Sequence, residues 1–531
     1  MRRLVTLASG LALALAACGH APRFKDQPVV WAVDDTRDIP QPEEQRWRPK
    51  RYFVDVLAFR KLTRILQIKV KQPAKNTNAL DEVPDSSWWN NRIGVRPMTP
   101  AEAAQGPGGG PPVRPFVISS GKSEGGNPGF FVKDAEGKVF LVKFDPVANP
   151  EMQTSASVIV GRFMWALGYN VPRDHIFIFK REELTIAPDA RMTDAMKRKR
   201  PLTVTDVEKV LATSPRTSDG SYRATSSEFL AGVPRGGLRP EGVRPDDPND
   251  RVAHQHRREL RGLRVFAAWL GHTDVKEDNF LDMYVTDGGR KYLRHYLVDF
   301  GEALGGHQAE KSLLEDGWEY VVDWEMSSKA LLALGLWKRP WEGQKSTPWK
   351  SVGYFGNSHF DPREWREAYP FWPFYEVTAA DAYWGAKLVM KFDRPMIEAI
   401  VAQGQLSDPA AAAYVVDTLI ARRDKIGRAY LDDVTPVDEL HLAGGVLCGV
   451  DLIARHGLGR PGVLESLDDD DRVVARETVA PDGKVCIAVP PTAEYHVTRL
   501  RLRRAGDEKP VMQVHHKGGP DARILGIIRV E

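Results

Sequence analysis

Cysteine is scarce in this chain, with three residues among 531, at positions 18, 448 and 486. No cysteine and histidine cluster has the spacing of a zinc site, so we expect no structural zinc. Charge of one sign is also scarce, because the formal net charge is +3 at pH 7. Such a balance gives no general field for nucleic acid or for an acidic membrane, and we expect no nucleic-acid partner.

The apolar stretch at the N-terminus, Leu4–Leu15, is too short to span a bilayer. It follows Met1-Arg2-Arg3 and leads directly to Ala16-Ala17-Cys18-Gly19. This arrangement resembles the signal peptide and lipobox of bacterial lipoproteins. The resemblance implies cleavage before Cys18, acyl chains on that cysteine and a mature chain anchored in the bacterial envelope, with Gly19 favouring the outer membrane. The alternative is an ordinary secretory signal.

The remaining length is sufficient for two or more domains. Residues 1–18 form the expected signal and lipobox, and 19–115 a tether and N-terminal extension. Within the extension, residues 19–50 are rich in proline and charge, and 100–115 carry too much glycine and proline for regular structure. Residues 433–531 contain short strands at sandwich-like spacing. Cys448 and Cys486 fall there, either as one disulfide or as two buried thiols.

Lys143 lies on a predicted strand beside a glycine-rich segment. Phe130–Val132 and Val139–Phe144 are two strands joined by a turn, with alternating apolar residues in the second. Reflection through that turn places Lys143 opposite Gly129, at the end of SSGKSEGGNPG. Bare backbone amides in such a loop approach phosphates closely, and a lysine supplies positive charge. The loop alone is a weak signal, since most glycine clusters are simply turns.

A second polar motif, HTDVKEDN at residues 272–279, directly follows a predicted amphipathic helix and precedes a predicted hairpin. Asn279 and Asp299 are symmetric about Gly289, so strand pairing brings both to the same open end. Asp274, in the loop before the hairpin, is then free to face them. Mg²⁺ takes oxygen ligands and commonly combines one or two protein groups with substrate phosphates, so these residues suit it.

These motifs resemble those of protein kinases, in the same order along the chain. His272–Asn279 is similar to the kinase catalytic loop HRDLKPEN, Asp299-Phe300-Gly301 to the DFG motif, and Phe140–Lys143 to the strand VAIK. The resemblance covers residues 116 to about 430 and is closer in layout to the HipA-type and secretory-pathway kinases than to eukaryotic protein kinases.

The resemblance implies an α+β fold, with a bilobal protein-kinase-like domain at 116–432 followed by a small all-β sandwich-like domain. The N-lobe spans about 116–180 and the C-lobe about 250–432. ATP or another nucleotide and Mg²⁺ are the implied cofactors, because phosphoryl transfer depends mainly on positioning and charge neutralisation. The implied site residues are Lys143, Glu151, Gly125, Gly126 and Gly129 for the nucleotide, Asp274 and Lys276 for catalysis, and Asn279 and Asp299 for the metal.

Two departures from the kinase pattern bear on activity. Kinases place a carboxylate on the helix after the lysine strand, whereas here the nearest acid is Glu151, at the very start of that helix. No APE-like segment follows Gly301. We therefore expect a membrane-anchored phosphotransferase that moves a phosphoryl group from a nucleotide to an unidentified hydroxyl acceptor. The alternative is a catalytically inactive, kinase-shaped scaffold or binding protein of the cell envelope, where ATP is scarce.

Two further segments complete the sequence-based picture. Tryptophan is dense between Trp318 and Trp384, and we expect these rings to pack a loop-rich insertion rather than to form a carbohydrate platform. Residues 214–250 are rich in serine, glycine, proline and arginine and are expected to form a loop. Helices are predicted again at Ala379–Lys391 and Ala410–Leu431.

Overall fold

The computed structural model describes residues 23–46, 48, 52–60, 71–122, 128–194, 196, 198–307, 311, 313–334, 336–490 and 494–530. The chain divides into two compact units. The large unit holds Trp31–Asn76 and Val83–Asp433, and the small unit holds Thr77–Glu82, the stretch from Val434 onward and the described residues up to Val30. Helices and strands are mixed, which confirms the α+β prediction. No helix in the described part of the chain has the length and apolar character needed to cross a bilayer.

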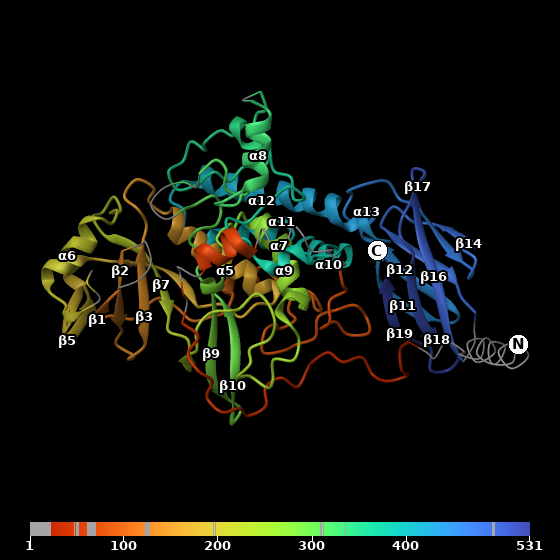
Figure 1. The fold of residues 1–531 in the computed structure, drawn as a ribbon, viewed down its shortest axis with the longest axis horizontal. Helices are drawn as coiled ribbons and strands as arrows, with labels where there is room; N and C mark the ends of the chain where they lie inside the picture. Colours follow the sequence, from red (N-terminus) through yellow and green to blue (C-terminus); the bar gives the residue numbers. More distant parts are fainter. Residues whose placement is uncertain are drawn as a thin grey trace, which may run out of the picture. The chain divides into compact units, whose positions relative to one another are not determined.

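A seven-stranded sheet begins the large unit (Figure 1). Its order is β4–β7–β3–β2–β1–β5–β6, and its neighbours pair antiparallel except β1 and β5, which are parallel. The strands are β1 (Phe116–Gly121), β2 (Gly129–Lys133), β3 (Val139–Phe144), β4 (Asp174–Phe179), β5 (Leu184–Thr193), β6 (Lys199–Pro201) and β7 (Tyr222–Glu228).

The β2–β3 hairpin has the predicted register. Gly129 pairs with Lys143, so the lysine emerges beside the end of the glycine-rich segment. Val142 and Phe144 are buried in the core of the sheet, and helix α6 (Val204–Ala212) covers this face with Val207 and other apolar side chains. Because side chains alternate along a strand, Lys143 points to the opposite face.

Strand β7 lies within residues 214–250, which were predicted to form a loop, and that prediction is wrong for Tyr222–Glu228. The strand pairs with both β3 and β4 and is therefore an interior strand of the sheet. Its sequence, YRATSSE, is polar, yet Thr225 and Ser226 are 4% and 0% exposed. Strand propensity depends strongly on neighbours, and here the flanking strands bury a segment that looks like surface from its composition.

The N-terminal extension is more regular than its composition indicates. Residues 100–115, predicted to lack regular structure, contain helix α4 (Pro100–Gln105). Thr99 and Glu102 form a reciprocal capping box, and Pro100 occupies the first helical turn, where its missing N–H costs nothing. Residues 31–46, predicted as part of an extended tether, pack along the large unit: Ser87 donates to the Asp35 carboxylate, and Ile39 is 5% exposed.

Helix α5 (Met152–Leu167) begins on the Lys143 face of the sheet and ends at Gly168, where the sequence predicted its end. Its first turn is held by Asp145, two residues after Lys143. The Asp145 carboxylate accepts hydrogen bonds from the backbone N–H of Gln153 (2.7 Å) and of Thr154 (2.9 Å). A buried carboxylate at a helix N-terminus is stabilised by the helix dipole, so this contact fixes the lysine strand to α5.

Helices and a three-stranded sheet form the rest of the large unit. The sheet has the order β10–β9–β8, with β8 at Val233–Pro234, β9 at Phe280–Asp287 and β10 at Arg290–Leu297. The helices are α7 (Arg258–Leu270), α8 (Trp324–Leu332), α9 (Trp372–Tyr375), α10 (Ala379–Val389), α11 (Arg394–Ala402) and α12 (Pro409–Tyr430).

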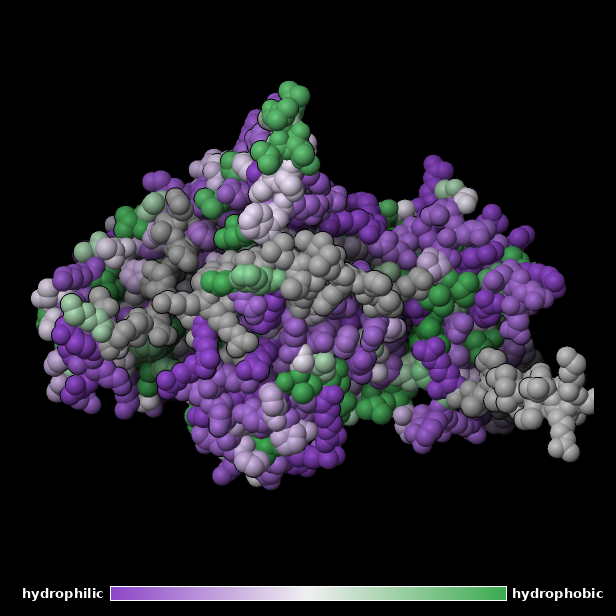
Figure 2. All heavy atoms as spheres, viewed as in Figure 1, coloured by the Kyte–Doolittle hydropathy of each residue, from purple (hydrophilic) through white to green (hydrophobic). Residues whose placement is uncertain are grey.

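The surface visible in Figure 2 is mostly hydrophilic. A protrusion at the end of α8 is coloured green, which marks hydrophobic residues.

The β9–β10 hairpin differs from its predicted register by one residue. Asp287 pairs with Arg290, so the turn is the two residues Gly288–Gly289 and is not centred on Gly289. Both glycines have positive φ, 55° and 78°, which a two-residue hairpin turn of this kind requires. Asn279 therefore lies opposite Val298, whose N–H donates to the Asn279 carbonyl (2.9 Å), and the DFG aspartate comes one residue later.

The small unit contains two antiparallel sheets that share one apolar core. One sheet has the order β11–β12–β15 and the other β14–β13–β16–β18–β19, with β17 paired to β16. The elements are β11 (Val437–Ala443), β12 (Val446–Asp451), α13 (Leu452–Arg455), β13 (Val463–Leu467), β14 (Val473–Thr478), β15 (Lys484–Ala488), β16 (Tyr495–Arg504), β17 (Asp507–Glu508), β18 (Met512–Lys517) and β19 (Arg523–Arg529).

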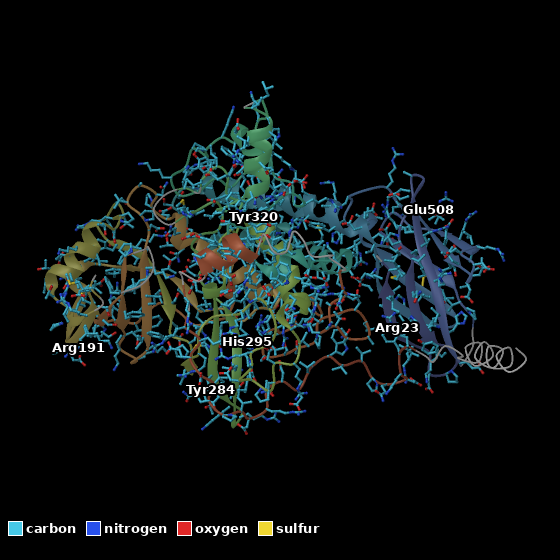
Figure 3. All side chains as sticks on the ribbon, viewed as in Figure 1. Arg23, Arg191, Tyr284, His295, Tyr320 and Glu508 are labelled. Carbon is cyan, nitrogen blue, oxygen red and sulfur yellow. A yellow bond between two sulfur atoms is a disulfide. The ribbon has the colours of Figure 1, made fainter. Side chains whose placement is uncertain are left out.

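Cys448 and Cys486 form a disulfide between the paired strands β12 and β15 (Figure 3). The sequence left open whether these cysteines are bridged or free, and the structure selects the bridge. Cys18 lies outside the described residues.

Two buried histidines make the stability of the small unit depend on pH. His515 accepts or shares a hydrogen bond with the Tyr495 hydroxyl (2.6 Å) and His516 with the Thr498 hydroxyl (2.8 Å). Burial lowers the pKa of each imidazole from 6.5 to about 4. The unfolded chain takes up protons as the pH falls through 6.5, whereas the folded unit stays neutral until about pH 4. We therefore expect the unfolding free energy of the small unit to decrease as the pH is lowered from 6.5 to about 4. Above pH 6.5 these two histidines should contribute no pH dependence.

Calorimetry between these pH values tests this expectation. All 14 tryptophans lie at positions 31–384, in the large unit. A calorimetric transition that tryptophan fluorescence also detects therefore belongs to the large unit, and one that it does not detect belongs to the small unit. The double variant His515→Gln/His516→Gln is expected to lose most of the pH slope, whatever its absolute stability. An unchanged slope would show that other groups cause it.

Candidate active site

An ion pair joins the lysine strand to the DFG motif. The Lys143 ammonium on β3 lies 3.0 Å from Oδ1 of Asp299, with the two side chains 23% and 47% exposed. Burial disfavours both charges, but the pair outweighs it, so the pKa of Lys143 is raised and the pKa of Asp299 is lowered. Asp299 also has a positive φ of 63°, an unusual backbone conformation for a residue other than glycine. Such conformations often occur at functional sites.

The HTDVKEDN segment forms a compact cluster around Asp274. The Lys276 ammonium lies 2.8 Å from the Asp274 carboxylate, and the Asn279 amide nitrogen donates to the same carboxylate at 2.8 Å. Asp274 is 5% exposed, and its Oδ1 accepts no hydrogen bond from the described residues despite its closeness to the ammonium. A buried carboxylate oxygen with this unused capacity is suited to accept a proton or a hydrogen bond from a bound hydroxyl.

Packing brings this cluster and the DFG motif together. The ring of His272 meets the ring of Phe300 edge to face, with centroids 5.7 Å apart, and both residues are 0% exposed. Phe300 also lies against α5, because a Cβ added at Gly161 would be 3.6 Å from its ring. The positive charge of Lys276 adds to that of Lys143 in lowering the Asp299 pKa. Of the residues predicted to share one site, Lys143 and Asp299 thus lie close to the Asp274 cluster.

Two charged residues that the sequence analysis did not identify complete the surroundings of Lys143. Lys122, just after β1, has a pKa lowered to about 8 by burial and by the charge of Lys143. Asp174, at the start of β4, is 7% exposed and accepts a hydrogen bond from the Ser227 hydroxyl. Burial raises the Asp174 pKa to about 6, and its charge acts on Lys143. The acid of strand β4, Asp174, therefore influences Lys143, whereas Glu151 at the start of α5 pairs elsewhere.

A further group of acids lies next to the cluster, after the DFG motif. Burial, and after it the negative charge of Asp274, raises the pKa of Glu302 to about 8. Nδ1 of His307 is 3.5 Å from Glu302 and 4.0 Å from Asp316. Burial and neighbouring acids raise the pKa of Asp316 as well. Burial is the larger cause of both raised pKa values and neighbouring acids are the smaller one, and a bound cation would favour the charged form of each carboxyl.

The predicted nucleotide-binding residues are only partly brought together. Gly129 faces Lys143, but a Cβ there would come 2.3 Å from the Val142 carbonyl oxygen, so strand packing alone requires this glycine. Glu151 does not pair with Lys143: its carboxylate accepts a hydrogen bond from the Ser407 N–H (2.9 Å). Gly125 and Gly126 lie outside the described residues.

The donor set fits a metal shared with phosphates better than a metal held by the protein alone. No group of three or more His, Cys, Asp or Glu side chains within the described ranges is arranged to hold a metal ion. Asn279 uses its amide nitrogen on Asp274, which leaves its amide oxygen for another partner, and Asp299 supplies a half-exposed carboxylate. One amide and one carboxylate beside lysines match the few protein ligands that Mg²⁺ takes when phosphates supply the others.

The aromatic segment touches this site through Tyr369, whose ring centroid lies 5.5 Å from the Lys276 ammonium. Trp365, Phe374 and Trp384 are 4%, 6% and 2% exposed, in agreement with the packing prediction. A groove of about 990 Å³ runs over the same region, and its walls include Trp372 and Tyr375, whose rings stack at 5.3 Å. None of the predicted site residues lines this groove.

The sequence matches no protein-family model and no curated protein. A solved structure of the Golgi casein kinase with Mn/ADP bound is 10% identical, covers 60% of this chain and 71% of its own, and has a TM-score of 0.29. A second structure of the Golgi casein kinase is 10% identical, covers 59% and 74%, and has a TM-score of 0.21. TM-scores this low do not establish a shared fold.

Proposed function

We propose that this protein is a lipid-anchored, kinase-like phosphotransferase that moves a phosphoryl group from a nucleotide to a hydroxyl acceptor. In this proposal residues 116–432 form a bilobal kinase-like domain and residues 433–531 an accessory β domain. The observation that carries the proposal is the ion pair of Lys143 and Asp299 beside the Asp274 cluster. Three separate sequence motifs, each with a defined task in phosphoryl transfer, supply these groups.

The residues would divide the work as follows. Lys143, with Lys122 beside it, would bind the nucleotide phosphates. Asp274 would orient the acceptor hydroxyl and take its proton, held in place by Lys276 and Asn279. Lys276 also provides positive charge where the phosphoryl group transfers. Each contribution depends on positioning and electrostatics, which supply most of the catalysis in this reaction class.

Asn279 and Asp299 would hold Mg²⁺. When bound, the ion would neutralise phosphate charge and fix the phosphoryl group for in-line attack. In the structure Asp299 is paired with Lys143 instead. Binding of a metal nucleotide would release Lys143 from the carboxylate toward the phosphates, because both partners of the pair would gain opposite charges nearby.

The proposed anchor is Cys18 in the bacterial envelope, with a diacylglycerol on its thiol and an acyl chain on its amine, and the outer membrane is the expected site. Metabolic labelling with a radioactive fatty acid tests it, and Cys18→Ser should abolish the label. The phosphotransfer proposal stands apart from this result, because its residues all lie in the large unit.

Nucleotide binding separates the proposed enzyme from the alternative of an inactive scaffold. We expect ATP with Mg²⁺ to raise the melting temperature of the full chain carrying Cys18→Ser. Saturation at one hundred times Kd adds about 2.7 kcal/mol to the unfolding free energy. The shift should vanish in Lys143→Met and persist in Asp417→Asn, an exposed acid on α12. The absence of a shift with any nucleotide and divalent cation would favour the scaffold.

A further inference from the structure

Helix α8 carries an apolar tip that no described residue of the large unit covers. Leu331, Leu332, Leu334 and Leu336 are 76%, 81%, 87% and 90% exposed, the four highest values among the exposed large hydrophobic residues of the described chain. They fall within six consecutive positions, 331–336. Figure 2 shows them as the green end of the protrusion. A cluster of this kind marks an interaction surface, because single exposed apolar residues are common whereas contiguous ones are not.

The base of the protrusion is firmly fixed. Asp323 caps α8 by accepting hydrogen bonds from the N–H of Glu325 and of Met326, both at 3.1 Å, and it pairs with Arg366 at 2.8 Å. Met326 is 6% exposed, so the first turn is anchored in the protein interior. Tyr320 lies below the helix in Figure 3, where it lines the same groove as Trp324. The leucines are thus presented on a rigid support.

The residues around the tip have the composition of a membrane interface. Residues 329–341 read KALLALGLWKRPW, with three basic residues, two tryptophans and no acid. Lys338 is exposed and forms no ion pair with the described residues. Trp341 is fixed by its indole N–H, which donates to Glu319 at 2.6 Å. These three kinds of side chain partition at different depths of a lipid headgroup region. Leucine lies deepest, tryptophan lies at the headgroup level, and lysine or arginine lies nearest the water, which is the order found from the apex of the tip to its flank.

We propose that the α8 tip, residues 329–341, inserts into the surface of a lipid bilayer that contains anionic headgroups. The four leucines enter the boundary of the acyl chains, to a depth of roughly 5–10 Å. Trp337 and Trp341 lie at the headgroup level, and Lys338 meets the anionic phosphates, while Lys329 and Arg339 keep their ion pairs with Glu325 and Glu319. This contact is a second membrane site, independent of Cys18 and of the phosphotransfer proposal. It would hold the large unit against the membrane instead of leaving it at the end of a tether.

The charge pattern favours a bilayer over the other occupants of an apolar surface. A second copy of the chain packed tip to tip about a two-fold axis would bring the unpaired charge of Lys338 near its own copy at the edge of the apolar contact, and like charges so placed repel. A protein groove that receives four leucines would also have to accommodate both tryptophans. A membrane accepts all three residue types at their own depths without a shaped partner.

Vesicle flotation tests the proposal with the full chain carrying Cys18→Ser, so that no acyl chain contributes. We expect binding to vesicles of phosphatidylcholine and phosphatidylglycerol that weakens with added salt. Leu334→Ser/Leu336→Ser should lower the vesicle partition coefficient roughly tenfold, because two apolar side chains leave the bilayer. Val204→Ser, which changes a 59% exposed residue on α6, should leave binding unchanged. The N-terminal apolar stretch is present in all of these chains and contributes equally.

A fluorescent label reports on the tip directly. An environment-sensitive dye on Leu334→Cys should shift to the blue when vesicles are added, whereas the same dye on Val204→Cys should not. Flotation without a shift at residue 334 would overturn the proposal. So would a lipid-free dimer that becomes a monomer in Leu334→Ser/Leu336→Ser, which would identify the tip as a contact between copies. Equal flotation of all variants would also overturn it.

Discussion

Asp299→Asn is expected to lower the rate of phosphoryl transfer by on the order of a thousandfold. The substitution keeps the shape of the side chain and removes its negative charge, on which both metal binding and the ion pair with Lys143 depend. Folding should change little, because a half-exposed ion pair contributes at most about 1 kcal/mol. The large loss should therefore appear in turnover and not in stability.

The measurement is the release of ADP and of phosphorylated product at saturating nucleotide, alongside the melting temperature. Asp274→Ala should cause a comparable loss of transfer, while nucleotide binding persists because Asp274 is assigned to the acceptor hydroxyl. Asp417→Asn serves as the matched control, since it also removes one exposed aspartate charge. Unchanged transfer in both Asp299→Asn and Asp274→Ala would contradict the roles proposed for these residues.

Asp381→Ala is expected to lower the unfolding free energy of the large unit by about 3–5 kcal/mol. The carboxylate on α10 bridges two arginines of α7: Arg258 at 3.0 Å and Arg261 at 2.9 Å. All three side chains are at most 3% exposed. The variant removes the carboxylate that both buried guanidinium groups share, so that part of their desolvation cost is no longer offset. Urea unfolding followed by tryptophan fluorescence measures the effect, since every tryptophan is in the large unit.

The matched control is Asp417→Ala, which breaks a surface pair of the same chemistry. Asp417 lies 2.8 Å from Arg394, but their side chains are 65% and 53% exposed. Water screens this pair, so we expect a change of about 1 kcal/mol or less. Equal losses in the two variants would show that the buried bridge contributes no more than an exposed one. Because α7 leads directly into residues 272–279, Asp381→Ala should also weaken the positioning of Asp274.

The sequence predicted those parts of the site that depend on local periodicity. Counting through a turn placed Lys143 opposite Gly129, and helical spacing located the end of α5 at Gly168. The same counting put Asn279 opposite Asp299, and it missed by one residue because two glycines with positive φ allow a tighter turn. Register errors of this size are expected wherever the turn type is undetermined.

The site residues that sequence analysis missed are brought there by contacts between elements far apart in the chain. Asp174 approaches Lys143 across β7, a strand whose polar sequence gives no sign of burial. Lys122 directly follows β1 and belongs to the glycine-rich segment itself, 21 residues before Lys143. Asp145 looks like an ordinary turn residue until α5 is seen to start on it. Each of these residues could be recognised only by knowing which strands and helices become neighbours in the fold. The amino-acid composition of a segment carries no information about its neighbours.

The disulfide between Cys448 and Cys486 determines which fragments separate after limited proteolysis of the small unit. It closes a loop that contains β13, β14 and the exposed turn at residues 468–472, where proteases are most apt to cut. A single cut there leaves both fragments covalently joined, so they migrate together without reductant and separate when it is added. A small unit cut once in this turn would thus keep its two sheets associated as long as no reductant is present.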